Sequence, residues 1–335
     1  MKTNIYLIIM VVFILLGCEK EFVSPEPKSD PESIFEYFWK SYDTDYVIFE
    51  ERNLDWNAQY DIYRPMVKSS TTDDELFSIF KQILTPLNDG HVKLIKPNEK
   101  VFTTNIYYEY RLEDDLFDLD LIKNSYLNGD FEVNGYDFNT YGWLNNIGYV
   151  HTVWTSDNWE DMDAILNYFE TADGLIMDLR HNGGGDFTEA LSRFGRFTDQ
   201  ERLAFRSKTK NGEGSQDFTD WYQWKIWPEG NYFNKPIVVV TDRYTISAGE
   251  RLVMAYQALP NVTIVGDTTN GSISSLILRE LPNGWNYSVC PQKVESFDGN
   301  SYEGIGLIPD FLIKNTSEEM LNGQDKALEY ALSLF

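Results

Sequence analysis

A serine at the predicted start of a helix is the first candidate for chemistry: Ser247, in RYTISAGERLVMAYQAL (residues 243–259). The apolar run PIVVVTD (236–242) precedes it, so the pattern predicts a strand, a short loop and a helix. The spacing to Glu250 fits a capping box, in which two side chains satisfy N–H groups of the first turn. A strand-to-helix turn also exposes a hydroxyl at the helix N-terminus, where the dipole and the N–H of Ala248 can stabilise developing negative charge. We therefore predict that Ser247 both caps the helix and acts as a nucleophile.

A nucleophilic serine needs a general base, and the sequence contains three histidines. His91 lies in the polar turn LNDGHVKL, His151 in the middle of the strand-like GYVHTVW, and His181 in DLRHNGGGD beside a glycine-rich loop. A histidine in a strand is more often structural, so His151 is expected to be a core or surface residue. His91, which follows Asp89 and Gly90 in a polar turn, is the preferred base, with His181 as the alternative.

The loop NGGGD (Asn182–Asp186) follows a predicted buried strand and precedes a helix. Phosphate binding is one interpretation, but neither a Walker lysine nor the G-x-G-x-x-G spacing is present. The other interpretation is that glycine lets the backbone come close to a substrate and donate N–H groups, as in an oxyanion hole.

Four segments together resemble the catalytic core of the C-terminal-processing (tail-specific) serine peptidases. They are GLIMDLRHNGGGDF, VVVTDRYTISAGERLVMAYQAL, TIVGDTTNG and YEGIGLIPD, in that order, within residues 143–335. LNDGHVKL is also similar to a segment of the branch that includes the tricorn core protease. The resemblance implies a crotonase/ClpP-like α/β core, a helical N-terminal region and cleavage of peptide bonds, with a peptide or protein as substrate.

The resemblance also implies roles for individual residues. The family's nucleophile falls on Ser247. The classical processing peptidases take a lysine as base shortly after a segment that corresponds to GDTTNG (Gly266–Gly271), but Ser272 follows here and no lysine occurs before Lys293. The tricorn-like branch instead uses a histidine oriented by a glutamate. His91 matches the histidine.

The remaining members of the implied site can also be assigned. Glu303, just before GIGLIPD, matches the glutamate that orients the histidine. Gly184 or Gly185 would complete an oxyanion hole with Ala248. One departure is Gly90, where the tricorn protease has a serine in its charge network.

The N-terminus, MKTNIYLIIMVVFILLGC, has the charged start and short apolar run of a secretory signal. Its end, LLGC, resembles the lipobox of bacterial lipoproteins, in which Cys18 carries the lipid. We therefore expect a signal peptide at 1–17, a tether at 18–30 and attachment to the cell envelope outside the cytoplasm. The lipid is the expected membrane contact, on the periplasmic or outer-membrane face.

The composition excludes several other classes of function. With 28 basic and 53 acidic residues the net charge is −25, which opposes nucleic-acid binding. Three dispersed histidines and Cys290 show no metal-ligand spacing, so neither a metal nor another cofactor is expected. Cys290 is interpreted as a small buried residue without a chemical role. The sequence leaves the oligomeric state open.

The elements that must position these residues form three regions. Residues 31–91 show helical spacing of apolar residues and form an N-terminal helical region. Residues 92–142 are expected to be an irregular, β-rich connecting segment, in which NIYYEYRL is extended and which is too short for a PDZ domain. From 143 to 335 strands and helices alternate as βαβ units, which predicts an α/β fold. ISSLILRELPNGWNYSVC adds a hairpin that turns at residues 282–284.

Two alternatives to a peptidase remain open. The same scaffold serves in relatives as a carrier of apolar ligands, so a non-catalytic ligand- or peptide-binding lipoprotein is one. A surface protein that binds glycans or a partner is the other, suggested by nine tryptophans and 21 tyrosines. The dense aromatic cluster WYQWKIWPEG (Trp221–Gly230) is interpreted as a lid, a substrate wall or a cover of the core.

Overall fold

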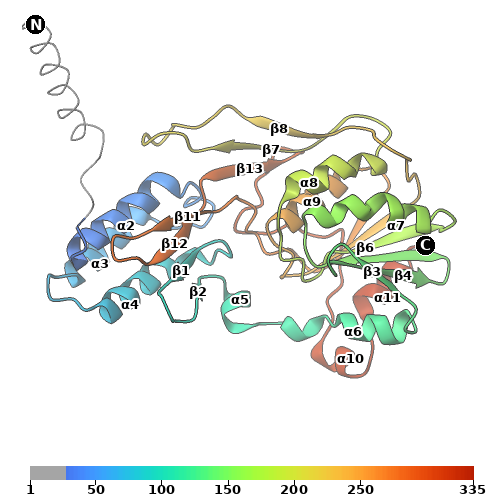
Figure 1. The fold of residues 1–335 in the computed structure, drawn as a ribbon, viewed down its shortest axis with the longest axis horizontal. Coiled ribbons are helices and arrows are strands. Elements are labelled where there is room, and N and C mark those ends of the chain that lie inside the picture. The colour runs from blue at the N-terminus through green and yellow to red at the C-terminus, as the bar shows by residue number, and fades with distance from the viewer. Residues whose placement is uncertain (1–27) are drawn as a thin grey trace, which may run out of the picture.

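The computed structural model describes residues 28–335 (Figure 1). The expected signal peptide, Cys18 and most of the tether lie outside the described residues, and the lipid anchor stays a prediction. Within the described part of the chain, none of the helices combines the length and apolar character needed to cross a membrane.

A seven-stranded sheet forms the centre of the larger layer. Its order is β14 (Phe311–Leu312), β10 (Val262–Gly266), β9 (Ile237–Thr241), β6 (Gly174–Asp178), β5 (Ile147–Thr152), β4 (Asn139–Leu144) and β3 (Glu132–Asn134). The strands from β14 to β5 pair in parallel, whereas β4 and β3 pair antiparallel. Parallel neighbours require crossover connections, and the expected α/β fold is confirmed.

Helices cover both faces of this sheet. The helices α7 (Met162–Tyr168), α8 (Phe187–Arg193) and α9 (Ala248–Gln257) lie on one face, and α11 (Lys326–Leu332) lies on the other (Figure 1). In β9, Ile237 and Val239 belong to the core cluster that includes α9, whereas Val238 and Val240 belong to the cluster that includes α11. A strand buried on both sides needs apolar residues at every position, which is why its sequence is a continuous apolar run.

The N-terminal layer combines helices with strands from both ends of the chain. Its helices are α2 (Pro31–Asp45), α3 (Trp56–Tyr63) and α4 (Asp73–Leu84), and its sheet has the order β11 (Ile277–Glu280), β12 (Asn286–Val289), β1 (Lys93–Ile95) and β2 (Phe102–Thr103). The helix α4 begins at a capping box of Thr72 and Glu75 and buries one apolar face. The hairpin β11–β12 is confirmed, and it belongs to this layer rather than to the layer of the large sheet.

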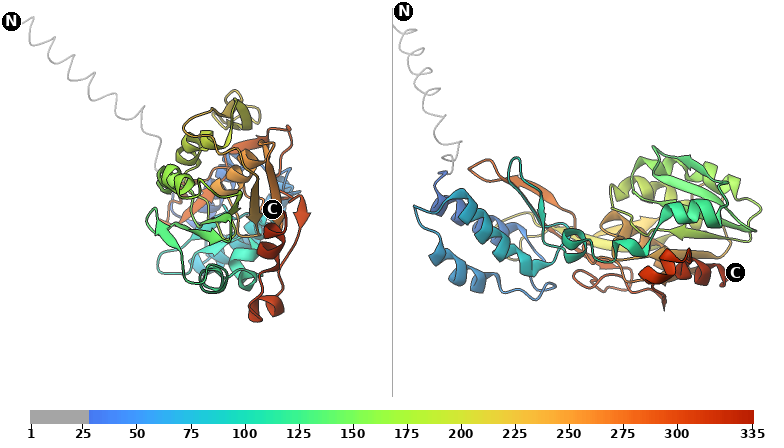
Figure 2. Two further views of the ribbon diagram at one scale, coloured as in Figure 1. Left: turned by 90° about the vertical axis from the view of Figure 1, so that its right-hand side faces the viewer. Right: turned by 90° about the horizontal axis from the view of Figure 1, so that it is seen from below.

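A third sheet lies above the junction of the two layers. It contains β13 (Gln292–Ser296), β7 (Arg202–Thr209) and β8 (Tyr222–Ile226), all antiparallel. Figure 1 shows it along the upper side, and Figure 2 shows the N-terminal helices and the large sheet at opposite ends of the molecule.

The expectation that NIYYEYRL is extended was wrong. Residues Ile106–Tyr110 form the helix α5, because the side chain of Asn105 accepts hydrogen bonds from the N–H groups of Tyr107 and Tyr108 and so starts a helix. The short helix α6 (Leu119–Leu121) and a π-helical turn at Ile122–Tyr126 follow. The connecting segment is therefore a mixture of short helices and strands. The helix α10 (Ser317–Leu321) precedes α11 at the other end of the chain.

The N-terminal layer depends on stacked aromatic rings, and this can be tested at Phe38. Its ring lies 3.9 Å from that of Phe80 at an interplanar angle of 13°, and the side chain is fully buried. We expect Phe38→Ala to lower the free energy of unfolding by about 3–5 kcal/mol in urea denaturation, because a large cavity replaces the ring. Tyr37→Ala, on the exposed side of the same helix, is the control. Equal effects of the two substitutions would contradict this account of the core.

Candidate active site

A cavity of about 1150 Å³ lies between the N-terminal layer and the large sheet. Ser247 and His91 both line it, although they come from different layers and make no hydrogen bond to each other. Its apolar wall consists of Val101, Tyr108, Trp154, Phe187, Trp224, Ile246 and Leu276. Trp224 comes from the aromatic cluster at 221–230 and stacks on Phe205, so part of that cluster is a wall of the cavity.

Ser247 lies at a sharp turn between β9 and α9. Its backbone has φ 60° and ψ −120°, a region that non-glycine residues seldom adopt and that tight, functional turns often contain. The loop that contains Gly184 (φ +87°) comes so close that a Cβ at Gly184 would lie 2.7 Å from the Cβ of Ser247. Only glycine fits this contact, which places the glycine-rich loop directly beside the serine.

Glu250 holds the turn in place. Its buried carboxylate accepts hydrogen bonds from the N–H groups of Ser247 (3.1 Å), Ser272 (3.0 Å) and Gly271 (2.7 Å), and from Thr269 Oγ1 (2.6 Å). Burial raises the pKa of Glu250 to about 7, against the opposing effect of these four donors. The expected capping partner of Ser247 thus also fixes the loop at 269–272.

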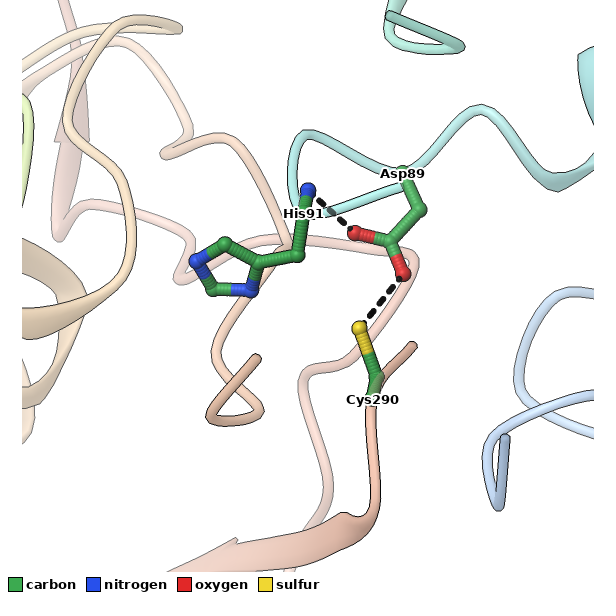
Figure 3. Close-up of side chains that lie close together, drawn as sticks. All are labelled: Asp89, His91 and Cys290. Atoms are coloured by element: carbon green, nitrogen blue, oxygen red, sulfur yellow. Dashed lines mark hydrogen bonds between the residues drawn. The ribbon is translucent and has the colours of Figure 1, made fainter. Parts of the chain in front are cut away.

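His91 is buried in the turn just before β1. Its backbone N–H donates to Asp89 Oδ1 at 2.8 Å, and its carbonyl oxygen accepts from Ser288 Oγ at 2.5 Å. The ring nitrogen Nδ1 has no hydrogen-bond partner within residues 28–335 and lies on the side of Asp89 and Cys290, while Nε2 points the other way (Figure 3). Burial lowers the pKa of His91 to about 4, although the charge of Asp89 acts in the opposite direction. The imidazole is therefore neutral at neutral pH, as a general base must be.

The other two histidines lie elsewhere. His151 is buried and its Nε2 lies 2.9 Å from the carbonyl oxygen of Arg180, which confirms a structural role in the core. His181 Nε2 lies 3.4 Å from Asp242 Oδ2, and its ring packs between Tyr244 and Phe117. Neither residue is part of the cavity wall.

Glu303 is close to the site but does not contact the imidazole of His91. Its carboxylate accepts from the N–H groups of Ile273 and Ser274 and lies 3.1 Å from Arg52 Nη2. Burial raises the pKa of Glu303 to about 8, although the charge of Arg52 acts against this shift. The acidic residue nearest to the imidazole is Asp89, which sequence reasoning did not single out although it stands two positions before His91.

Arg52 connects these acidic residues. Its Nη2 also lies 3.5 Å from Asp89 Oδ1 and donates to the carbonyl oxygen of Gly271 at 2.6 Å. Arg52, Asp89 and Glu303 therefore form one buried charge network. No local pattern around Arg52 indicated this role, since its partners lie far away in the sequence.

Asp89, His91 and Cys290 together have the residue types of a metal site. One ligand atom of each lies within 4.8 Å of the others, and all three are buried (Figure 3). The Asp89 carboxylate, however, already accepts from Tyr46 (2.8 Å), from the Cys290 thiol (3.4 Å) and from the His91 N–H, with Arg52 beside it. Such a carboxylate is satisfied by donors, and a nearby guanidinium opposes a second cation. The arrangement suits a hydrogen-bond network better than a metal.

The glycine-rich loop is tied to the serine turn by Asn182. The side-chain oxygen of Asn182 accepts from the N–H of Gly184 at 3.0 Å. The backbone carbonyl oxygen of Asn182 accepts from the N–H of Ile246 at 3.1 Å. The N–H of Gly184 is therefore already engaged. In contrast, the N–H groups of Gly185 and Ala248 donate to no acceptor in the described chain, and both residues line the cavity.

The surroundings of His91 lead to a prediction that NMR titration can check. We expect the folded protein to show a His91 pKa of about 4, well below the ordinary value of about 6.5. The contribution of His91 to the free energy of unfolding is fully present above pH ~6.5 and should be lost as the pH falls toward 4. The reason is that His91 in the unfolded chain takes up its proton at a higher pH than in the folded protein. Asp89→Asn should lower the pKa of His91 further, because the aspartate charge favours the imidazolium form. Glu303→Gln is the control, and a larger shift there than in Asp89→Asn would contradict the assignment of the nearer carboxylate.

Comparisons with known proteins relate the chain to a family of peptidases. Residues 146–313 match the model of peptidase family S41, and residues 27–85 match that of the tricorn protease C1 domain. A putative peptidase from Parabacteroides merdae is similar in structure, with a TM-score of 0.82 and 30% sequence identity, over 92% of this chain and 97% of that one. Mature CPAF in complex with lactacystin has the same fold, with a TM-score of 0.69 and 12% identity, over 91% of this chain and 97% of that one.

A carboxyl-terminal-processing protease from Synechocystis sp. is 26% identical over 203 residues, which are 56% of this chain and 44% of that protein. The chain spans less than half the length of the first curated relatives that it matches. The family model covers the strands and loops that carry Ser247, the glycine-rich loop and Glu303. Together with the similarity over nearly the whole chain, this shows that the protein belongs to peptidase family S41.

Proposed function

We propose that the chain is a serine-type peptidase that hydrolyses peptide bonds through an acyl-enzyme on Ser247, with His91 as general base. The observation that carries the proposal is that a serine on a strained turn and a buried, neutral histidine line one cavity. Curated relatives from Synechocystis sp. and Bacillus subtilis are carboxyl-terminal-processing proteases, which supports a peptide or protein substrate.

The reaction would have two halves. Ser247 Oγ attacks the carbonyl carbon of the scissile bond while His91 Nε2 accepts the hydroxyl proton, and His91 then gives this proton to the leaving amine. In the second half a water molecule gives a proton to His91 and attacks the ester carbon. His91 then returns this proton to Ser247 Oγ as the ester bond breaks, which releases the new carboxyl end and restores both residues. Since the two side chains are not hydrogen-bonded here, they would have to come together when substrate binds, as catalytic hydrogen bonds often do.

The N–H groups of Ala248 and Gly185 are the best candidates for the oxyanion hole. Both groups are available, and Ala248 opens α9, where the helix dipole favours negative charge. Gly184, the other candidate from the sequence, would instead keep the loop close to Ser247 through its contact with the serine and its bond to Asn182.

The acidic member of the proposed Ser-His-Glu arrangement would act through an intermediary. Glu303 holds Arg52, and Arg52 holds Asp89, whose carboxylate lies beside His91. Asp89 would therefore be the group that stabilises the imidazolium directly, and Glu303 would be a positioning residue that acts through Arg52.

Replacing the nucleophile tests the proposal most directly. We expect Ser247→Ala to abolish peptide hydrolysis while circular dichroism and thermal unfolding stay close to those of the parent. A fluorophosphonate probe should add one adduct to the parent, measured as intact mass, and none to the variant, since only an activated serine reacts. Hydrolysis by the variant at the parent rate would refute the role of Ser247. A folded parent that forms no adduct and cleaves no peptide would favour the ligand-binding alternative.

Replacing the base separates the two candidate histidines. We expect His91→Ala to lower kcat/KM by roughly 10²- to 10⁴-fold, as is typical for loss of a general base. His181→Ala should retain most of the activity, because His181 pairs with Asp242 away from the cavity. The reverse result in steady-state assays would assign the base to His181.

A further inference from the structure

Arg251 is a buried cation in the wall of the cavity, one helical turn from the nucleophile. Its backbone N–H donates to the carbonyl oxygen of Ser247 at 3.1 Å, so both residues lie on the same side of α9. The residue is only 8% exposed. A charged group in such a place needs an explanation, because burial of an unpaired charge is costly.

The hydrogen-bond partners of Arg251 orient its guanidinium and carry no charge themselves. Nε and Nη2 donate to the carbonyl oxygen of Ile273, and Nη2 also donates to Ser275 Oγ (3.1 Å) and Gln292 Oε1 (2.6 Å). All of these acceptors are neutral, and Arg251 forms no ion pair with any other described residue. Nη1 has no hydrogen-bond partner among them. Burial lowers the pKa of Arg251 to about 10, although the nearby carboxyl groups of Glu303 and Glu250 favour the charged form, so the group keeps its charge at neutral pH.

The other charged side chains of the cavity wall are two lysines and two carboxylates, so Arg251 leaves the wall with one net positive charge. Lys93 lines the same wall without an ion pair to any described residue, and its charge disfavours protonation of His91. Of the two carboxylates in the wall, Glu109 lies 3.8 Å from Lys100, and Asp186 accepts from the N–H and the hydroxyl of Thr188 at the start of α8. Two of the three cations in the wall, Arg251 and Lys93, therefore form no ion pair with a described residue, in a chain whose net charge is −25.

We propose that Arg251, assisted by Lys93, selects substrates that carry a carboxylate close to the scissile bond. This inference rests on the proposed peptidase function of the same cavity. The carboxylate can be the side chain of an aspartate or glutamate, or the C-terminal carboxylate of the substrate. A guanidinium that is held in a fixed orientation forms strong, directional hydrogen bonds to such a group, and pairing removes the cost of the buried charge.

The test uses binding as well as turnover, so that it does not depend on activity. The probes are fluorescently labelled, alanine-based octapeptides in which a single central position holds glutamate or glutamine. The position is varied from one peptide to the next, and each peptide is made with a free and with an amidated C-terminus. Their affinity for the Ser247→Ala protein is measured by fluorescence anisotropy, and kcat/KM is measured with the parent. We expect at least one carboxylate-bearing peptide to be favoured by about tenfold over its neutral counterpart, with the preference falling as salt is added.

Variants assign this preference to Arg251. Arg251→Gln should reduce the discrimination to less than about twofold while leaving the affinity for the neutral peptides nearly unchanged. A purely structural role would instead weaken all peptides equally. Arg251→Lys, which keeps the charge, should retain part of the preference and serves if the glutamine variant does not fold. Arg206→Gln is the matched control, since Arg206 is half-exposed, pairs with Glu295 and lies outside the cavity wall.

The outcomes separate the two proposals. Equal binding of charged and neutral peptides, or no binding, overturns the role of Arg251, as does a preference that survives in Arg251→Gln. Cleavage without charge preference would leave the peptidase function intact and refute this inference. Charge-dependent binding without any cleavage would support the role of Arg251 in recognition and refute the peptidase function. A preference that follows the glutamate identifies an acidic side chain as the recognised group, and one that disappears on amidation identifies the C-terminus.

Discussion

The arrangement of the site depends on the contacts that the buried guanidinium of Arg52 makes. The proposed nucleophile belongs to the large sheet and the proposed base to the N-terminal layer, so their relative position is only as precise as the contact between the layers. Arg52 lies between α2 and α3, bonds to the carbonyl oxygens of Asn88 and Gly271, and lies beside Asp89 and Glu303. Separating the layers would leave the charges of this buried network without partners, which is energetically costly. The network therefore holds the two layers in one relative position.

The buried acidic residues serve a second purpose, which follows from the irregular backbone around the cavity. Loops that bring a serine, a histidine and glycines together cannot use the regular hydrogen bonds of helices or sheets, yet their buried N–H groups still need acceptors. Glu250 and Glu303 accept hydrogen bonds from successive N–H groups of the segment 271–274. Asp89 accepts one from the N–H of His91. Carboxylates thus replace the missing secondary structure, which explains why so many of them are buried at one place.

Much of the architecture could be predicted from the sequence, because the strands of the large sheet are buried on both faces and leave an apolar run such as that before Ser247. Local patterns failed where a single side chain decided the structure: Asn105 starts a helix in a segment whose aromatic residues alternate as in a strand. The presence of Ser247 and His91 in one cavity was expected from the resemblance to a known family. The spacing of apolar residues in the sequence does not predict it. The burial of Cys290 was predicted, whereas its contact with Asp89 and the role of Arg52 were missed because the partners of both residues are brought to them only by the fold. The contact of Glu303 with Arg52 rather than His91 was missed for the same reason.

The hairpin β11–β12 has a consequence for how the protein is made. It is encoded near the end of the chain, yet it completes the sheet of the N-terminal layer, where Tyr287 and Cys290 join a core formed by the first helices. Proteins are synthesised from the N-terminus, so the first layer remains without its last two strands until residues 277–290 have emerged. Because β1 and the loop before it lie against these late strands, His91 reaches its final environment only when the chain is nearly complete. A chain that has not yet reached residue 290 therefore lacks part of the surroundings of His91, and the proposed site can form only after these residues have emerged.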